Sequence, residues 1–181
     1  MRTEFDFINN NYKNQRTWMG NVMYTITKFF ANILIKYRWL YYVLNYTWGL
    51  GMTIVGWLVY WFTRIFLCLY IDEHGKFGHC HYLMIGDNWG GLSLGTNLFI
   101  ASRMGDECTY HTKCHETGHT FQNAIWGPFA IFLIYIPSVI RYWYQTIRSK
   151  HNKSNVKYDC FWAEESATDI GTKFILKGYW H

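Results

Sequence analysis

The longest apolar run of this chain, residues 47–71, constrains the fold more than any other stretch of the sequence. Arg64 is its only charged residue, and the run exceeds the roughly 20 residues that a helix needs to cross the hydrocarbon core of a bilayer. We therefore expect a transmembrane helix here. The alternative is a buried helix of a soluble domain, and Gly49, Gly51 and Gly56 suit close helix packing in either case.

The composition is that of a single domain. Of the 181 residues, 50% are hydrophobic and 21% are aromatic, which is ample for one core. We divide the chain into a polar N-terminus with an amphipathic helix (1–46), the apolar run (47–71) and a region with a candidate metal site (72–181). The net charge of +5 comes from dispersed basic residues without a nucleic-acid-binding motif, so we expect no nucleic-acid partner. The many Trp and Tyr residues favour a lipid bilayer as partner.

Cysteine usage and the N-terminus bear on location. The five cysteines lack the even spacing of a secreted disulfide scaffold, so we expect free thiols. The first twenty residues contain no apolar segment followed by a small-residue cleavage site. We therefore expect no removable signal peptide.

Strand-like patterns follow the apolar run. Residues 77–85 and 92–100 are joined by a Gly- and Asx-rich connection at 86–91, which predicts an antiparallel β-hairpin. The expected fold class is thus α+β and mainly helical, with membrane-associated helices and a small hairpin. An exposed strand edge next to a catalytic site can bind an extended peptide by main-chain hydrogen bonds.

A His-Glu-x-x-His motif follows the predicted hairpin. On a helix capped by Thr112, His115 and His119 lie one turn apart on one face, where both can bind one metal ion. Glu116 is offset by one position, so its carboxylate can act on a metal-bound water without displacing a ligand. Gln122 extends the same face.

A catalytic zinc site needs a third protein ligand, and residues 162–169 supply two candidates. Glu164 would be followed one turn later by Thr168, and Glu165 would be followed by Asp169. Either polar residue can hydrogen-bond a histidine ligand and fix its tautomer. The spacing alone leaves both alternatives open.

The apolar segment 124–137 separates the histidines from these glutamates. If it crossed a bilayer, the ligands would lie near opposite surfaces, about 30 Å apart, and one metal could not join them. Pro128 and Pro137 interrupt the segment, which predicts a broken or re-entrant path.

The His115-Glu-x-x-His119-x-x-Gln122 pattern with a downstream glutamate resembles the gluzincin metallopeptidases. Several further segments are similar to a family of small membrane proteins of bacteria and phages, and the similarity covers residues 48–174. They are Asn88-Trp-Gly-Gly, His111-Thr-Lys-x-His-Glu-x-Gly-His, Gln122-Asn, Trp126-Gly-Pro, Ile136-Pro-Ser, Arg141-Tyr-Trp-Tyr and Trp162-x-Glu-x-x-Ala-Thr-x-x-Gly-Thr172. The resemblance implies Glu164 as third ligand, with Thr168 where gluzincins more often have aspartate, and location at the bacterial cytoplasmic membrane.

The predicted function is zinc-dependent hydrolysis of a peptide or protein substrate, with Glu116 as general base. For the oxyanion donor, Tyr142, Tyr158 and His111 are equal candidates. Two alternatives stay open. One is a non-catalytic membrane protein with a structural metal site, and the other is an intramembrane enzyme resembling the site-2 proteases, with Asp169 as third ligand.

Overall fold

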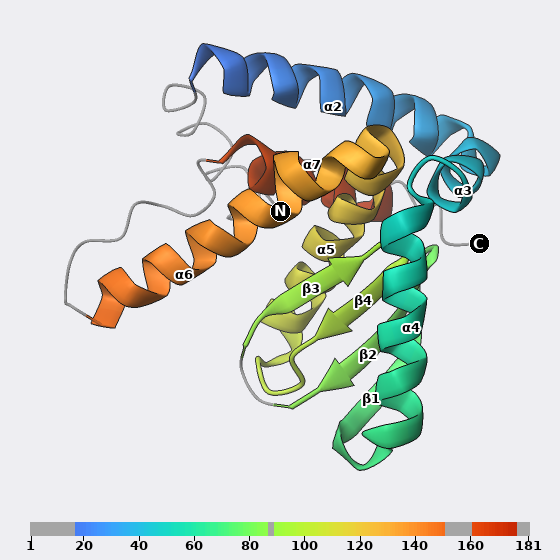
Figure 1. Cartoon of the computed structure of the whole chain (residues 1–181), viewed down its shortest axis with the longest axis vertical. Helices are drawn as coiled ribbons and strands as arrows, with labels where there is room; N and C mark the ends of the chain where they lie inside the picture. Colours follow the sequence, from blue (N-terminus) through green and yellow to red (C-terminus); the bar gives the residue numbers. More distant parts are fainter. Residues whose placement is uncertain (1–16, 87–88, 151–160, 177–181) are drawn as a thin grey trace.

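A computed structural model describes residues 17–86, 89–150 and 161–176. The fold is α+β and mostly helical around one small sheet, as the sequence predicts (Figure 1). The N-terminal residues 1–16 and the candidate donor Tyr158 lie outside the described residues.

The predicted amphipathic helix is divided into α2 (Trp18–Lys36) and α3 (Arg38–Tyr46). Thr17 caps α2 by accepting a hydrogen bond from the backbone N–H of Gly20 at 3.1 Å. The break falls at Tyr37, whose backbone is not helical (φ −114°, ψ 79°). α2 turns Ala31, Leu34 and Ile35 into the core.

The single helix predicted for 47–71 is shorter in the structure. Helix α4 spans Leu50–Phe66, a 3₁₀ turn follows at Cys68–Tyr70, and strand β1 (Ile71–Phe77) begins where the helix was expected to continue. In the described ranges, no single helix combines the length and apolar composition that a membrane span requires. α3 and α4 reach that threshold only as a pair, bent by 82°.

The predicted hairpin is wrong in its pairing. Strands β1, β2 (Cys80–Ile85), β3 (Gly91–Leu94) and β4 (Asn97–Ile100) form a sheet in the order β1-β2-β4-β3. β1–β2 and β3–β4 are antiparallel hairpins, whereas β2 and β4 run parallel. Each predicted strand contains a turn, at Gly78 (φ +58°) and Gly95 (φ +60°), a conformation that favours glycine.

The helix of the His-Glu-x-x-His motif starts two turns earlier than predicted. α5 spans Asp106–Trp126, and its N-cap is Gly105 rather than Thr112. Asp106 and Glu107 lie in its first turn, where negative charge complements the helix dipole.

The break predicted within 124–137 is confirmed. Gly127 adopts φ +52° and opens a 3₁₀ turn, Gly127–Phe129, which leads into one π-helical stretch, Ile131–Tyr135. The axes before and after this turn differ by 116°. Helix α6 (Ile136–Lys150) then leads away, and α7 (Trp162–Leu176) returns to lie along α5 (Figure 1).

The sheet lies between two helices. Leu83 and Phe99 face α4 through Tyr60, because alternate residues of a strand point to opposite faces. On the other face, β3 and β4 pack beside α5, and the Cys80 thiol of β2 contacts the Thr120 hydroxyl. Helix α5 is thus buried between the sheet and the pair α2 and α7.

Candidate metal centre

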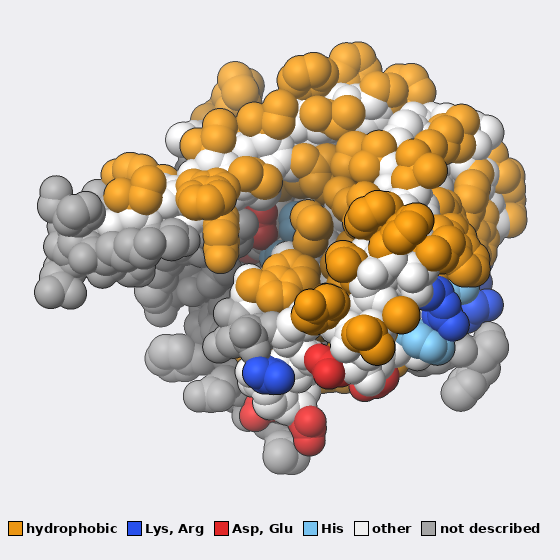
Figure 2. Space-filling view, turned by 60° about the horizontal axis from the view of Figure 1, so that its bottom comes forward, with side chains coloured by type: hydrophobic (Ala, Val, Ile, Leu, Met, Phe, Trp, Pro, Cys, Tyr) orange, Lys and Arg blue, Asp and Glu red, His pale blue; other side chains and the backbone are white. Residues whose placement is uncertain are grey.

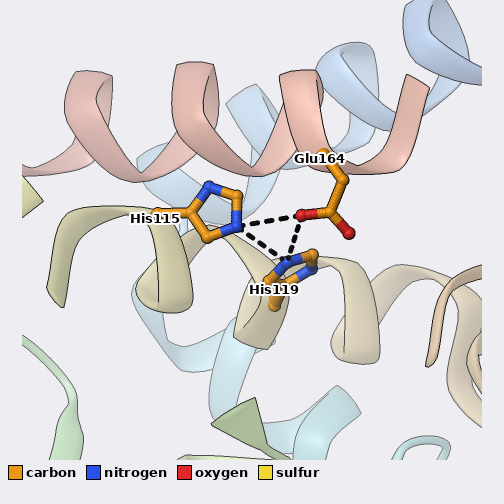
Figure 3. A group of neighbouring side chains, drawn as sticks. All are labelled: His115, His119 and Glu164. Carbon is orange, nitrogen blue, oxygen red and sulfur yellow. Dashed lines mark hydrogen bonds and ion pairs between the residues drawn. The ribbon is translucent and has the colours of Figure 1, made fainter. Parts of the chain in front are cut away.

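His115, His119 and Glu164 form one cluster between α5 and α7 (Figure 3). The His115 and His119 Nε2 atoms lie 3.2 Å apart, and Glu164 Oε2 lies 3.1 Å and 3.6 Å from them. Tetrahedral ligands about 2.0 Å from a zinc ion lie about 3.3 Å from one another. The three atoms are therefore spaced as three corners of a zinc coordination tetrahedron.

Two glycines allow the helices that carry these ligands to touch. A methyl group at Gly118 of α5 would overlap the carbonyl oxygen of Ala167, and one at Gly171 of α7 would overlap that of Cys114. The backbones of α5 and α7 therefore meet directly at these two points. Because Gly118 and Gly171 lack side chains, the two helices lie close enough for Glu164 to reach both imidazoles.

The Nδ1 atoms of both histidines are held by neighbouring polar groups. The Thr168 hydroxyl donates to the Glu164 carbonyl oxygen at 3.2 Å, so it accepts from His115 Nδ1, 2.8 Å away. His119 Nδ1 donates to Gln122 Oε1 at 2.7 Å. Both Nε2 atoms are thereby turned to one point with their lone pairs available for a metal.

Gln122 is itself fixed in orientation. Its Nε2 donates to the carbonyl oxygen of Ala163 at 2.6 Å and to the Ser166 hydroxyl at 2.8 Å. The amide oxygen is therefore the atom that faces His119. Thr168 and Gln122 thus each hydrogen-bond the Nδ1 atom of one histidine and fix the orientation of its ring.

Asp169 does not support the cluster, contrary to the second sequence frame. It accepts hydrogen bonds from Tyr24 and from Lys28 Nζ (2.8 Å), both on α2, so it joins α2 to α7. Burial and Asp169 raise the pKa of Tyr24 to about 12. Among the described residues, the cluster that could hold a metal does not include Asp169, the third ligand in the alternative that resembles the site-2 proteases. Glu165 is buried but lies outside the cluster, because neighbouring residues of a helix point about 100° apart.

Glu116 is buried on the side of α5 that faces the sheet. A Cβ atom at Gly91, the first residue of β3, would lie 2.8 Å from Glu116 Oε1. The carboxylate therefore occupies the space that the absent side chain leaves open. It lies between the histidine ligands along the chain and next to an edge strand in space.

Two further polar residues reach the site from the segment after the break, and sequence analysis did not identify them. The Ser138 hydroxyl donates to Glu164 Oε1, which leaves Oε2 to face the histidines. The Tyr135 hydroxyl is buried and has no regular hydrogen bond in the described part of the chain. Burial and the charge of Glu116 raise the pKa of Tyr135 well above its ordinary value. Tyr135 and Ser138 lie three residues apart in an otherwise apolar segment, and this spacing was the signal in the sequence that could have identified them.

Without metal, the cluster holds a proton. Burial would lower the pKa of His119, but the Glu164 carboxylate outweighs burial and raises it to about 9. Burial would likewise raise the pKa of Glu164, but His119 and His115 hold it well below its ordinary value. At neutral pH the metal-free site is thus an imidazolium–carboxylate pair, and a metal ion would take the place of the proton.

Comparisons of this chain with protein-family models, with curated proteins and with solved structures found no match. The similarity to gluzincins therefore stays a prediction from the motif.

Proposed function

We propose that this protein is a zinc-dependent hydrolase of peptide bonds. The observation that carries the proposal is the spacing of His115 Nε2, His119 Nε2 and Glu164 Oε2, which matches three corners of a zinc tetrahedron. Two imidazoles and one carboxylate are a donor set that catalytic zinc sites use, with the fourth position left for water. A zinc ion bound there would supply an activated water and polarise the scissile carbonyl group.

Glu116 is the general base of this proposal. It follows a histidine ligand directly, so it sits beside the site without belonging to the ligand set. It accepts the proton of the attacking water and delivers it to the leaving amine. The buried Tyr135 hydroxyl, whose pKa is raised by burial and by the charge of Glu116, joins Tyr142, Tyr158 and His111 as a candidate donor to the oxyanion.

The edge of β3 supports a peptide as substrate class. In the described sheet β3 pairs with β4 alone, and it is the last strand in the order β1-β2-β4-β3. Gly91 at its start touches Glu116. An extended peptide pairing with this edge would pass beside the proposed general base, with its main chain held by strand hydrogen bonds.

The test compares the full-length protein with Glu116→Gln. Zinc content is measured in both, and both are incubated with a library of unstructured peptides. We expect one zinc per chain in each protein, and cleavage by the unmodified protein that falls by about 10³-fold or more in the variant. Glu107→Gln, at an exposed position of the same helix, is the matched control and should leave cleavage unchanged.

Two results would overturn the proposal. Unmodified protein that contains no zinc, and takes none up on addition, would remove the metal site. Zinc-loaded protein that cleaves no peptide would instead favour a structural metal joining α5 to α7. That second function has its own support in the burial of the cluster, since Glu164 is 1% exposed and His119 is 7% exposed.

A further inference from the structure

Four helices expose apolar side chains that the fold leaves uncovered. They include Phe29 on α2, Trp39 on α3, Leu58 and Ile65 on α4, and Trp143 on α6, each more than 60% exposed. Soluble monomers rarely expose apolar surface so extensively without a partner for it. Figure 2 shows hydrophobic side chains over most of one face, with charged side chains gathered in its lower part.

α4 contributes a continuous apolar groove to this surface. The groove has a volume of about 700 Å³, and its lining runs from Tyr46 along α4 to Phe66. The axes of α3 and α4 differ by 82°, so the exposed apolar side chains of the two helices extend in two directions. The surface is therefore broad, whereas a narrow stripe would fit one partner helix.

The charges on these helices have one sign. Residues 18–71 contain no Asp or Glu and four basic residues, of which Lys28 pairs with Asp169 of α7 and the others are Lys36, Arg38 and Arg64. Residues 127–150 likewise contain basic residues but no acidic ones. A second copy of this chain would bring like charges together across such a face. An anionic lipid surface has the complementary charge, and Trp and Tyr are the side chains enriched where a bilayer meets water.

We propose that α2, α3, α4 and α6 together form a bilayer-contacting face, on which the protein lies without any one helix having to cross. The apolar side chains enter the boundary between headgroups and acyl chains, while Lys36 and Arg64 stay level with the headgroups. In Figure 2 a hollow opens within this face, rimmed by hydrophobic side chains and with histidine and acidic side chains at its base.

The test is flotation of the full-length protein with vesicles of phosphatidylcholine, with and without phosphatidylglycerol. We expect binding to both and tighter binding to the anionic vesicles. The double variant Leu58→Asp and Ile65→Asp should lose about tenfold or more in binding. Cys108→Asp adds an acid at an exposed position in the first turn of α5 and should bind like the unmodified protein.

A substitution that removes one positive charge tests the electrostatic contribution to vesicle binding without changing the apolar surface. Lys36→Gln should weaken binding to anionic vesicles about fivefold and leave binding to phosphatidylcholine unchanged. Lys76→Gln, on β1, is the control and should have no effect.

The proposal is overturned if the unmodified protein stays with neither vesicle, or if the double aspartate variant binds as well as the unmodified protein. It is also overturned if mass measurement in solution shows a dimer that the double variant converts to a monomer, because a second copy would then cover the face. Far-UV circular dichroism of each variant confirms that the fold is retained. Vesicle binding does not depend on peptide cleavage, so the two proposals fail separately.

Discussion

At the scale of single residues, the tautomers of the two histidines depend on Thr168 and Gln122. Thr168 accepts from His115 Nδ1 only because its own hydroxyl hydrogen is directed to the Glu164 carbonyl. A hydroxyl is therefore needed at residue 168, and the methyl group of threonine is not.

We expect Thr168→Val to weaken zinc binding about 10- to 100-fold, because His115 loses the partner that orients its ring. Thr168→Ser should retain nearly all of the affinity. The measurement is competition with a chromophoric chelator. Equal affinities for the valine and serine variants would show that the hydroxyl has no part in orienting His115.

The raised pKa of His119 makes zinc binding depend on pH. The imidazole is protonated below about pH 9 in the metal-free protein, and the proton must leave before Nε2 can bind zinc. The apparent affinity should therefore rise with pH, about tenfold per unit, and level off near pH 9. The same chelator competition across pH measures this slope. A flat profile between pH 7 and 9 would mean that His119 carries no proton to displace.

At the scale of elements, the contact between α5 and α7 leaves no room for side chains at the glycines. Gly118→Ala should lower the free energy of unfolding by about 3 kcal/mol or more, since the methyl group would overlap the Ala167 carbonyl. Gly51→Ala is the matched control, because nothing lies within 4 Å of the added methyl group in α4. It should stabilise the helix by about 0.5–1 kcal/mol.

Denaturant unfolding of the metal-free proteins measures both changes. If Gly118→Ala unfolds at the same midpoint as the unmodified chain, the two helices are not in backbone contact. Zinc affinity should fall in parallel with stability, because Glu164 can reach the histidines only across this contact.

The sequence predicted the elements of the site better than it predicted their partners. The motif helix and the downstream ligand helix follow from local spacing, and the histidine pair needs no long-range information. Asp169 was one of two open candidates for a hydrogen bond to a histidine ligand, and its contact with Lys28 was not foreseen because Lys28 lies far away in sequence on α2. The parallel pairing of β2 with β4 was missed for a similar reason, since Gly78 and Gly95 each turn the chain inside an apparently continuous strand.

At the scale of the whole molecule, the zinc ion that we propose would join α5 and α7 at the centre of the fold. Bound zinc should therefore raise the melting temperature, and saturation at about 100 times the dissociation constant adds about 2.7 kcal/mol. His119→Ala removes a ligand and should abolish this shift. The measurement is a thermal melt with and without zinc. A shift of equal size in His119→Ala would place the stabilising zinc elsewhere.

The break at Gly127 has a consequence for the order of events during synthesis. The histidine ligands precede the break, and Glu164 follows it by a long connection. Because chains fold from the N-terminus as they are made, α2, α3 and α4 leave the ribosome well before α7 exists. The third ligand of the proposed zinc site is therefore the last one to be synthesised, so the complete ligand set exists only once α7 has been made.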